Sequence, residues 1–315
     1  MNGFLEEYDG VRYQLPQLLE WELTYTAGIP CDSFSVQCVY DPELKEHLHK
    51  AVEFTAEETG RMFRGIVDEY QVTWDGNGRR MEVTGRGMAA RLLDNEAEAR
   101  EYGVATLDDI LRNHVILYGI EVGERDDLPA VPGFAVASGS SQWQVLYQFA
   151  CYYGGITPRF DREGRLLLCG WADGTVKKLD DTVPVLSIRQ REKRYGVLSE
   201  LLVRDKTQKR IETIQNQAFL AEGGQCSRVI TMPGRSSYQA MRYSGAYQIR
   251  RSEAERNRVE LTVAVPFWGW PGELVELKLE RAGLEGRYRV LEASTGTGED
   301  GAWTRLTLGE PDVLL

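Results

Sequence analysis

Apolar and polar side chains alternate along several short segments of this chain, and this alternation constrains the fold more than any other feature. Residues 259–265 and 275–279 carry an apolar side chain at every second position, and residues 34–40 do so with one apolar exception. Successive side chains of a β-strand point to opposite faces of a sheet, so each pattern indicates a strand with one buried face. We therefore expect antiparallel β-structure in both halves of the chain.

Turn signals separate the predicted strands. Asp75-Gly76-Asn77-Gly78 lies between strand patterns at residues 62–74 and 81–84, and Gly and Asn tolerate the positive φ that tight hairpins need. Strands and turns follow one another here without long helices, which favours closure into a small barrel or sandwich. No internal repeat of the sequence is evident.

The central part of the chain has a different pattern. Thr106 is placed to cap one helix, and Ser140 or Ser141 is placed to cap a second that ends at Gly154-Gly155. A hairpin with a turn at residues 161–164 follows. These features predict a compact α/β module.

Together these patterns predict a mainly β protein with an α+β insert, in which two small β-barrel domains flank a compact α/β module. We expect an N-terminal β-barrel domain over residues 1–95 and the small α/β module over residues 96–180. Residues 181–315 would then form a C-terminal β-domain, with a second barrel built from strands at about 259–310. Further candidate strands in this last domain lie at residues 197–203, 210–215 and 228–232.

The charge of the chain excludes several classes of function. It has 37 Lys and Arg against 48 Asp and Glu among 315 residues, a net charge of −11. Sequence-independent binding to nucleic acid needs a basic surface, so we expect no nucleic-acid partner. No apolar run reaches the roughly 18 residues of a membrane span, and the acidic N-terminus does not resemble a signal peptide, so we expect no membrane partner.

One glycine motif has the spacing of a dinucleotide-binding turn. Residues Gly85–Ala90 fit G-x-G-x-x-A between a strand and a helix, and Asp108 and Asp109 lie about 20 residues further on. The preceding strand alternates, whereas a buried parallel strand is a continuous apolar run. We therefore favour a tight turn that leaves the barrel, with Gly85 or Gly87 at positive φ, and expect no cofactor.

Catalytic and metal-binding residues are not singled out by any pattern. His47 and His49 are two residues apart, a spacing that does not place both imidazoles on one helix face. His114 is better explained as a hydrogen-bonded histidine of the core or of its edge. The five cysteines are scattered and form no C-x-x-C pair, so buried free thiols are expected. Carboxylates are abundant, but no spacing selects a glycosidase pair. We predict no catalytic residue and no metal site.

An aromatic segment between two predicted strands is the candidate interface. Phe267, Trp268 and Trp270 lie between Pro266 and Pro271. The segment could fill its own barrel, or it could bind a partner, since Trp is enriched at interface hot spots. Two large rings in one short loop cannot easily enter the same small barrel. We therefore expect at least one of them to contact a neighbouring subunit or another partner protein.

Several segments, taken in order, resemble the corresponding segments of a known protein family. The resemblance covers nearly the whole chain. The resemblance is to baseplate hub proteins of contractile phage tails, above all the XkdQ/YqbQ-type hubs of Firmicutes prophages, and more distantly to late control D proteins. The matching segments are Met81 to Ala97, Phe63-Arg64-Gly65-Ile66-Val67, Ser141-Gln142-Trp143, Pro158-Arg159-Phe160-Asp161, Gly164-Arg165-Leu166, Pro271-Gly272-Glu273-Leu274-Val275 and Gly286-Arg287-Tyr288-Arg289-Val290.

The resemblance implies a structural protein of a phage, tailocin or other contractile injection particle. It implies a homotrimeric ring whose six similar barrels adapt a six-fold tail tube to a three-fold central spike. The partners would be the tail tube protein, the spike, and other baseplate and tape-measure proteins in a particle assembled in the host cytoplasm. Two alternatives stay open: an enzyme, either a cell-wall hydrolase or a nucleotide-binding enzyme using Gly85–Ala90, and a binding module that uses its aromatic loops.

Overall fold

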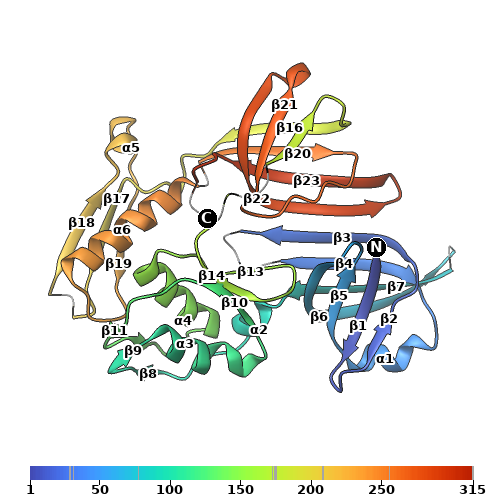
Figure 1. Cartoon of the computed structure of the whole chain (residues 1–315), viewed down its shortest axis with the longest axis horizontal. Helices are drawn as coiled ribbons and strands as arrows, with labels where there is room; N and C mark the ends of the chain where they lie inside the picture. Colours follow the sequence, from blue (N-terminus) through green and yellow to red (C-terminus); the bar gives the residue numbers. More distant parts are fainter. Residues whose placement is uncertain are drawn as a thin grey trace.

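The computed structural model describes residues 1–27, 30, 32–76, 78–171, 173, 176–207, 209–254 and 256–313. Strands hold 46% of the chain and helices 19%, so the predicted mainly β class is confirmed. Figure 1 shows two curved sheets stacked one above the other, with a helical module and a smaller α+β unit on one side of them.

The N-terminal barrel is a strongly curved antiparallel sheet. Its strands run in the order β3-β4-β7-β6-β5-β1-β2, and its core contains Leu23, Phe34, Phe54 and Met81. The alternation predicted for residues 34–40 is observed, because every second side chain of β4 is buried. Asn77, within the predicted hairpin turn, lies outside the described residues. The elements are β1 (Asn2–Glu7), β2 (Arg12–Gln14), β3 (Leu18–Thr26), β4 (Ser33–Val39), α1 (Leu44–Lys50), β5 (Ala51–Glu57), β6 (Arg61–Asp75) and β7 (Gly78–Gly87).

The C-terminal barrel is built around two long strands that form one hairpin. Its core contains Leu261, Val275 and Leu277, apolar positions of the predicted alternating segments, together with Leu306 of β23. The parallel strand β15 adds to the edge of β21. The elements are β15 (Lys177–Asp180), β16 (Val185–Glu192), β20 (Asn257–Val263), β21 (Leu274–Leu279), η3 (Glu280–Ala282), β22 (Leu284–Gly298) and β23 (Gly301–Gly309).

The two barrels share one continuous sheet. The first part of β22, Leu284–Arg289, pairs with β21 of its own barrel. Beyond it, Glu292–Thr297 pair with Thr26–Trp21 on β3 of the N-terminal barrel. The ladder therefore runs from β16 through β22 and β3 to β6 without a break (Figure 1).

The middle module packs helices against short strands. The predicted caps are observed: Thr106 forms a reciprocal capping box with Asp109, and the Ser141 hydroxyl accepts from Gln144 N. These bonds satisfy backbone N–H groups that a helix start leaves without partners. The elements are α2 (Ala90–Leu93), β8 (Arg100–Glu101), β9 (Val104–Ala105), α3 (Leu107–His114), η1 (Ile116–Tyr118), β10 (Val122–Arg125), β11 (Val131–Pro132), β12 (Ala135–Val136), α4 (Gln142–Phe149), η2 (Ala150–Gly154), β13 (Arg159–Phe160) and β14 (Leu166–Leu168).

A small α+β unit interrupts the C-terminal barrel between β16 and β20. Its three strands agree with the predicted segments, but the longest helix of the described chain, α6, was not predicted. That helix carries few large apolar residues: Met241, Tyr247 and Ile249 are buried together with Ser244 and Gly245. Small residues let it pack closely on β17 and β18, and this gives little apolar periodicity to detect. The elements are β17 (Glu200–Arg204), β18 (Ile211–Gln215), α5 (Gln217–Ala221), β19 (Ser227–Thr231) and α6 (Tyr238–Glu253).

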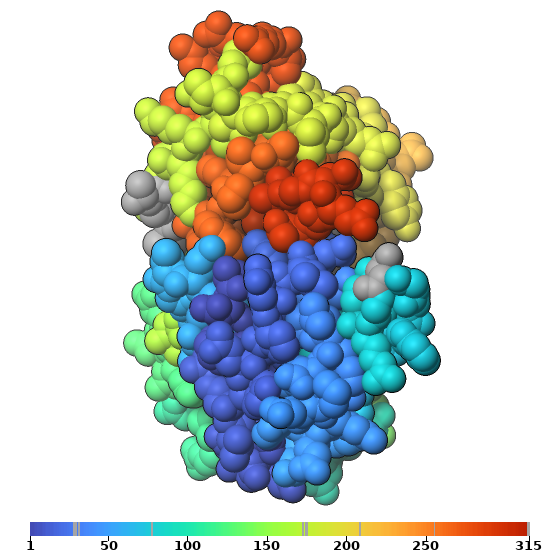
Figure 2. All heavy atoms as spheres, turned by 90° about the vertical axis from the view of Figure 1, so that its right-hand side faces the viewer, coloured from blue at the N-terminus to red at the C-terminus, as the bar shows by residue number. Residues whose placement is uncertain are grey.

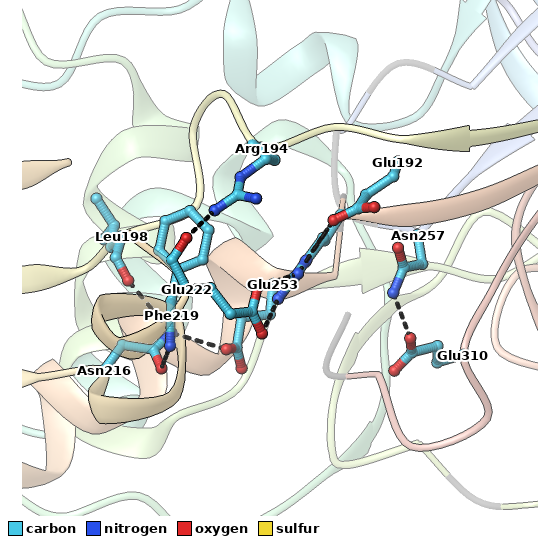
Figure 3. A network of polar contacts seen from close by, with 10 residues as sticks. Glu192, Arg194, Leu198, Asn216, Phe219, Glu222, Glu253, Asn257 and Glu310 are labelled. Atoms are coloured by element: carbon cyan, nitrogen blue, oxygen red, sulfur yellow. Dashed lines mark hydrogen bonds and ion pairs between the residues drawn. The ribbon is translucent and has the colours of Figure 1, made fainter. Parts of the chain in front are cut away.

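A polar network fastens this unit to the end of the barrel strands (Figure 3). The Arg256 guanidinium donates to Glu192 at 3.0 Å and also to Glu222. Within the unit, Asn216 Nδ2 donates to Glu253 Oε1 at 2.7 Å. Because Glu192 is the last residue of β16, the network holds the end of that strand in place.

Candidate interface at the junction of the two barrels

The aromatic segment forms the connection between β20 and β21. Phe267 packs against the core of its own barrel, and its backbone N–H donates to Thr304 Oγ1 at 2.8 Å. Trp268 and Trp270 are half-buried and turn the other way, into the core of the N-terminal barrel. The two indole rings are stacked on each other, with centroids 6.2 Å apart and planes 14° apart.

Two aromatic side chains of β3 receive these rings. Trp21 stacks with Trp268 at 5.8 Å, and Tyr25 meets Trp270 edge to face at 4.6 Å. Aromatic pairs of this geometry add about 0.5–1.5 kcal/mol to the free energy of area burial. Sequence reasoning missed both β3 partners, although Trp21, Leu23 and Tyr25 occupy alternate positions of one strand and could have been found as one apolar face.

A lysine from β15 holds the segment in this position. Lys177 Nζ donates to the carbonyl oxygen of Trp268 and to Glu273 Oε2, the latter at 2.6 Å. The same Glu273 oxygen accepts from Trp270 N at 2.9 Å. Side-chain and backbone contacts therefore fix the direction in which both rings project.

The structure changes the reason for expecting a partner at this loop. The two rings share one destination, because Trp268 and Trp270 both contact the N-terminal barrel of their own chain. The rings had two expected destinations, the loop's own barrel and a neighbouring subunit, and the N-terminal barrel of the same chain is a third. Contact of Trp268, Trp270 or Phe267 with another subunit or a tail tube stays a prediction.

A cavity of about 300 Å³ opens beside Trp270, where the two barrels meet the middle module. Tyr25 and Asp32 line it from the N-terminal barrel, and Arg162 lines it from the turn between β13 and β14. The Arg162 guanidinium lies 5.6 Å from the Trp270 ring centroid, within the range of a cation–π contact. Residues from all three parts of the chain therefore line the cavity.

Asp32 is an unusual acid in this cavity. Burial raises its pKa to about 7, because the charged carboxylate loses its hydration. Bonds from the backbone N–H and the hydroxyl of Thr26, at 2.7 and 3.3 Å, favour the charged form and offset only part of this effect. The folded protein thus holds this proton more tightly than the unfolded chain does.

Asp32→Asn should change how stability depends on pH. A raised pKa means that the Asp32 contribution to stability is fully present below pH 4 and is lost as the pH rises to about 7. Asparagine cannot ionise, and its amide oxygen can still accept from Thr26. We expect the variant to melt at a higher temperature than wild type at pH 8, and the difference to vanish towards pH 4. Equal melting curves at pH 8 would contradict the raised pKa.

The glycine motif is part of an antiparallel strand. Gly85 and Gly87 lie in β7, and neither has a positive φ, so that expectation was wrong. Glycine is needed there for space: a Cβ on Gly85 would lie 1.9 Å from Ile66 O, and one on Gly87 would lie 2.9 Å from Asp32 Cβ. The segment that follows is only the short helix α2. The two acids at the ribose-binding spacing are engaged elsewhere, Asp109 in its helix cap and Asp108 with Arg125 at 2.6 Å.

The three histidines occupy separate environments. His47 pairs with Glu7 and stacks on Tyr13, whereas His49 bonds to the Tyr70 hydroxyl at 2.9 Å. His114 is buried between the Tyr102 hydroxyl and Gln142 Oε1, which confirms its expected place in the core. Burial lowers the pKa of His114, with the Gln142 bond acting in the opposite direction.

The described part of the chain lacks both a metal-binding cluster and a helix suited to span a membrane. It holds no group of three or more His, Cys, Asp or Glu side chains arranged to bind a metal ion. None of its helices has the length and apolar character needed to cross a bilayer. Cys38, Cys151 and Cys169 are buried free thiols, Cys226 is half-buried and free, and Cys31 lies outside the described residues.

Two solved structures that share this fold are tail proteins, and a third belongs to a type VI secretion system. The tail protein of Neisseria meningitidis MC58 superposes with a TM-score of 0.80 at 16% identity, covering 99% of this chain and 97% of its own. The 43 kDa tail protein of prophage MuSo2 from Shewanella oneidensis gives 0.77 at 17% identity and covers both chains fully. A component of the E. coli type VI secretion system gives 0.57 at 12% identity, covering 93% of this chain and 73% of its own.

Comparison by sequence finds no such relatives. No protein-family model matches the chain, and no curated protein sequence matches it. At these low identities the structural likeness establishes a shared fold, which is that of phage tail proteins over nearly the full length of the chain.

Proposed function

We propose that this protein is a structural baseplate hub of a contractile phage tail or a tailocin-like particle, and not an enzyme. The observation that carries the proposal is a repeat within the fold. The strand order β3-β4-β7-β6-β5 of the first barrel recurs as β16-β20-β23-β22-β21 in the second, and every pairing in both is antiparallel. One subunit therefore presents two similar barrels side by side.

A chain with two similar barrels suits a symmetry adaptor. Three copies in a closed ring would present six barrels to a six-fold tail tube and three subunits to a three-fold central spike. The proposed partners are a second and third copy of the chain, the tail tube protein, the spike, and other baseplate and tape-measure proteins. The full-length likeness to two tail proteins supports this role, as does the position of Gly85 and Gly87 within an antiparallel strand instead of a phosphate-binding turn. The protein would reside in the particle.

The oligomeric state tests the proposal directly. We expect light scattering after size exclusion at micromolar concentration to give three times the 35.7 kDa subunit mass. Electron microscopy of the same fraction should show rings with a central opening. A stable dimer with two-fold symmetry would argue against a hub, since such an interface closes without forming a ring.

A further inference from the structure

The cavity beside Trp270 has walls made largely of rings and aliphatic side chains. Phe160, Trp171 and Trp270 line it together with Leu167 and Pro271, and its volume is about 300 Å³. Pockets that bind small molecules begin at about this size and combine a mainly apolar lining with a few polar groups. Figure 2 shows the outer face of the two barrels, where their surfaces meet along a seam. The cavity lies on the other side of this junction, where the middle module joins the barrels.

Asp32 is the acidic group of this cavity that lacks a cation. Its Oδ1 accepts both bonds from Thr26, and its Oδ2 accepts no hydrogen bond from the described residues. The pKa of Asp32 is raised by burial and lowered by the Thr26 bonds, and no basic side chain of the described chain adds to these causes. An enclosed carboxyl group is costly to ionise unless a cation accompanies it. The cavity therefore contains an acceptor whose charged form is not compensated by the chain.

Three other charged side chains of the lining have partners. Arg159 donates to backbone carbonyl oxygens of the segment that follows β14. Asp161 accepts from Arg165 Nε at 2.9 Å. Glu273 accepts from Lys177 Nζ, as described above. The hydrogen-bonding groups of these side chains are therefore already engaged.

Arg162 is the cation of the lining that has no acidic partner among the described residues. Its side chain is exposed and its guanidinium lies over the Trp270 ring, so it keeps much of its hydration. The pKa of Tyr25, raised mainly by burial, is raised further by Asp32 and lowered by Arg162. Both charges thus act on the Tyr25 hydroxyl without pairing with each other. Since desolvation burdens the enclosed carboxyl and not the exposed guanidinium, a ligand of opposite charge gains more at Asp32 than at Arg162.

We propose that this cavity binds a small organic cation, whose amidinium, guanidinium or ammonium group bonds to Asp32 Oδ2 and whose apolar body packs on Trp270. Aromatic faces attract cations, and a carboxylate gives the cationic head group a charge-assisted bond. A free molecule can carry this head group, and so can an arginine or lysine side chain of another protein, because the cavity offers both the same contacts. The site is separate from the proposed hub function and does not depend on it.

Benzamidine is a suitable probe, because it joins a flat ring to an amidinium group. We expect it to bind the full chain at pH 8 with a Kd of about 1 mM or below, measured by ligand-observed NMR, which is a modest affinity for a ligand of this size. Benzamide has nearly the same shape without the charge, and benzoate has the opposite charge. Both should bind about tenfold more weakly or worse, since neither supplies a cation to the carboxylate.

Asp32→Asn removes the charge that the head group needs. We expect benzamidine to bind this variant about tenfold more weakly or worse at pH 8. The variant should be at least as stable as wild type at that pH, so the loss would not reflect unfolding. Lowering the pH from 8 to 5.5 should weaken binding to the wild type about tenfold or more, as Asp32 takes up its proton, but should not affect Asp32→Asn. Arg162→Ala removes a like charge from the cavity and should tighten binding.

Four results would overturn the inference. Equal binding of benzamidine and benzamide would show a purely apolar cavity. Tighter binding of benzoate that is lost in Arg162→Ala would show an anion site. Unchanged affinity in Asp32→Asn, or no binding of benzamidine at about 10 mM, would show that Asp32 holds no cation. Ring formation in any of these cases would leave the hub function standing.

A capped arginine, N-acetyl-arginine methylamide, distinguishes the two sources of the head group. Binding as tight as that of n-butylguanidine, which represents the arginine side chain alone, would assign the cavity to an arginine of a partner protein. Binding about tenfold weaker would show that the cavity does not admit a side chain attached to a backbone, and would assign it to a free molecule. In both cases the binding must be lost in Asp32→Asn.

Discussion

Gly85→Ala should lower the free energy of unfolding by about 3 kcal/mol or more, at the upper end of what overpacking costs. The added methyl group would lie 1.9 Å from Ile66 O and 2.6 Å from the Phe34 ring. The first of these atoms belongs to the backbone of β6 and cannot rotate away. Relief would require β6 and β7 to separate where their register shifts.

Urea denaturation followed by tryptophan fluorescence would measure this effect, because Trp21 and Trp270 report on the N-terminal barrel. Gly298→Ala is the matched control. Gly298 also lies in a long strand of a barrel and has no positive φ, but a Cβ there would meet no atom within 4 Å. We expect this control to stay within about 0.5 kcal/mol of wild type. Equal effects of the two substitutions would show that close approach of the strands is not the reason for glycine at position 85.

Trp270→Ala and Trp268→Ala should each lower the free energy of unfolding by about 2 to 3 kcal/mol. A fully buried aromatic side chain typically costs about 3–5 kcal/mol when truncated, and these rings are only half-buried. Each variant also loses an aromatic contact, to Tyr25 or to Trp21. Because both contacts join the two barrels, we expect the barrels to unfold at separate temperatures in calorimetry.

Sedimentation of the same variants would test the predicted contact with another subunit. A variant that keeps the melting temperature of the monomer but loses assembly would place its ring at a subunit interface. Loss of stability in both variants would assign the loop to the joint within the chain. Tyr195→Ala serves as the control, since that ring is 84% exposed and its removal should change stability by no more than about 0.5 kcal/mol.

The sequence was most informative where a residue's neighbours along the chain decide its secondary structure and its burial. Alternation at residues 34–40 and 259–265 correctly indicated strands with one buried face, and Thr106 and Ser141 identified helix starts. His114 was correctly placed in the core. Helix α6 escaped detection, because its contacts with β17 and β18 depend on small residues that carry no periodic apolar signal.

The tertiary structure alone decided which distant strands meet. Gly85 needs no side chain because Ile66, 19 positions earlier, passes within contact distance of it, and no local pattern reports that approach. Trp268 contacts Trp21, and Trp270 contacts Tyr25, although the partners are almost 250 residues apart in sequence. The repeat of the two barrels was likewise invisible in the sequence, since equivalent positions such as Trp21 and Ile188 share only their place in a backbone ladder. A ladder is built from backbone groups common to all residues, so its repetition leaves almost no trace in the side chains.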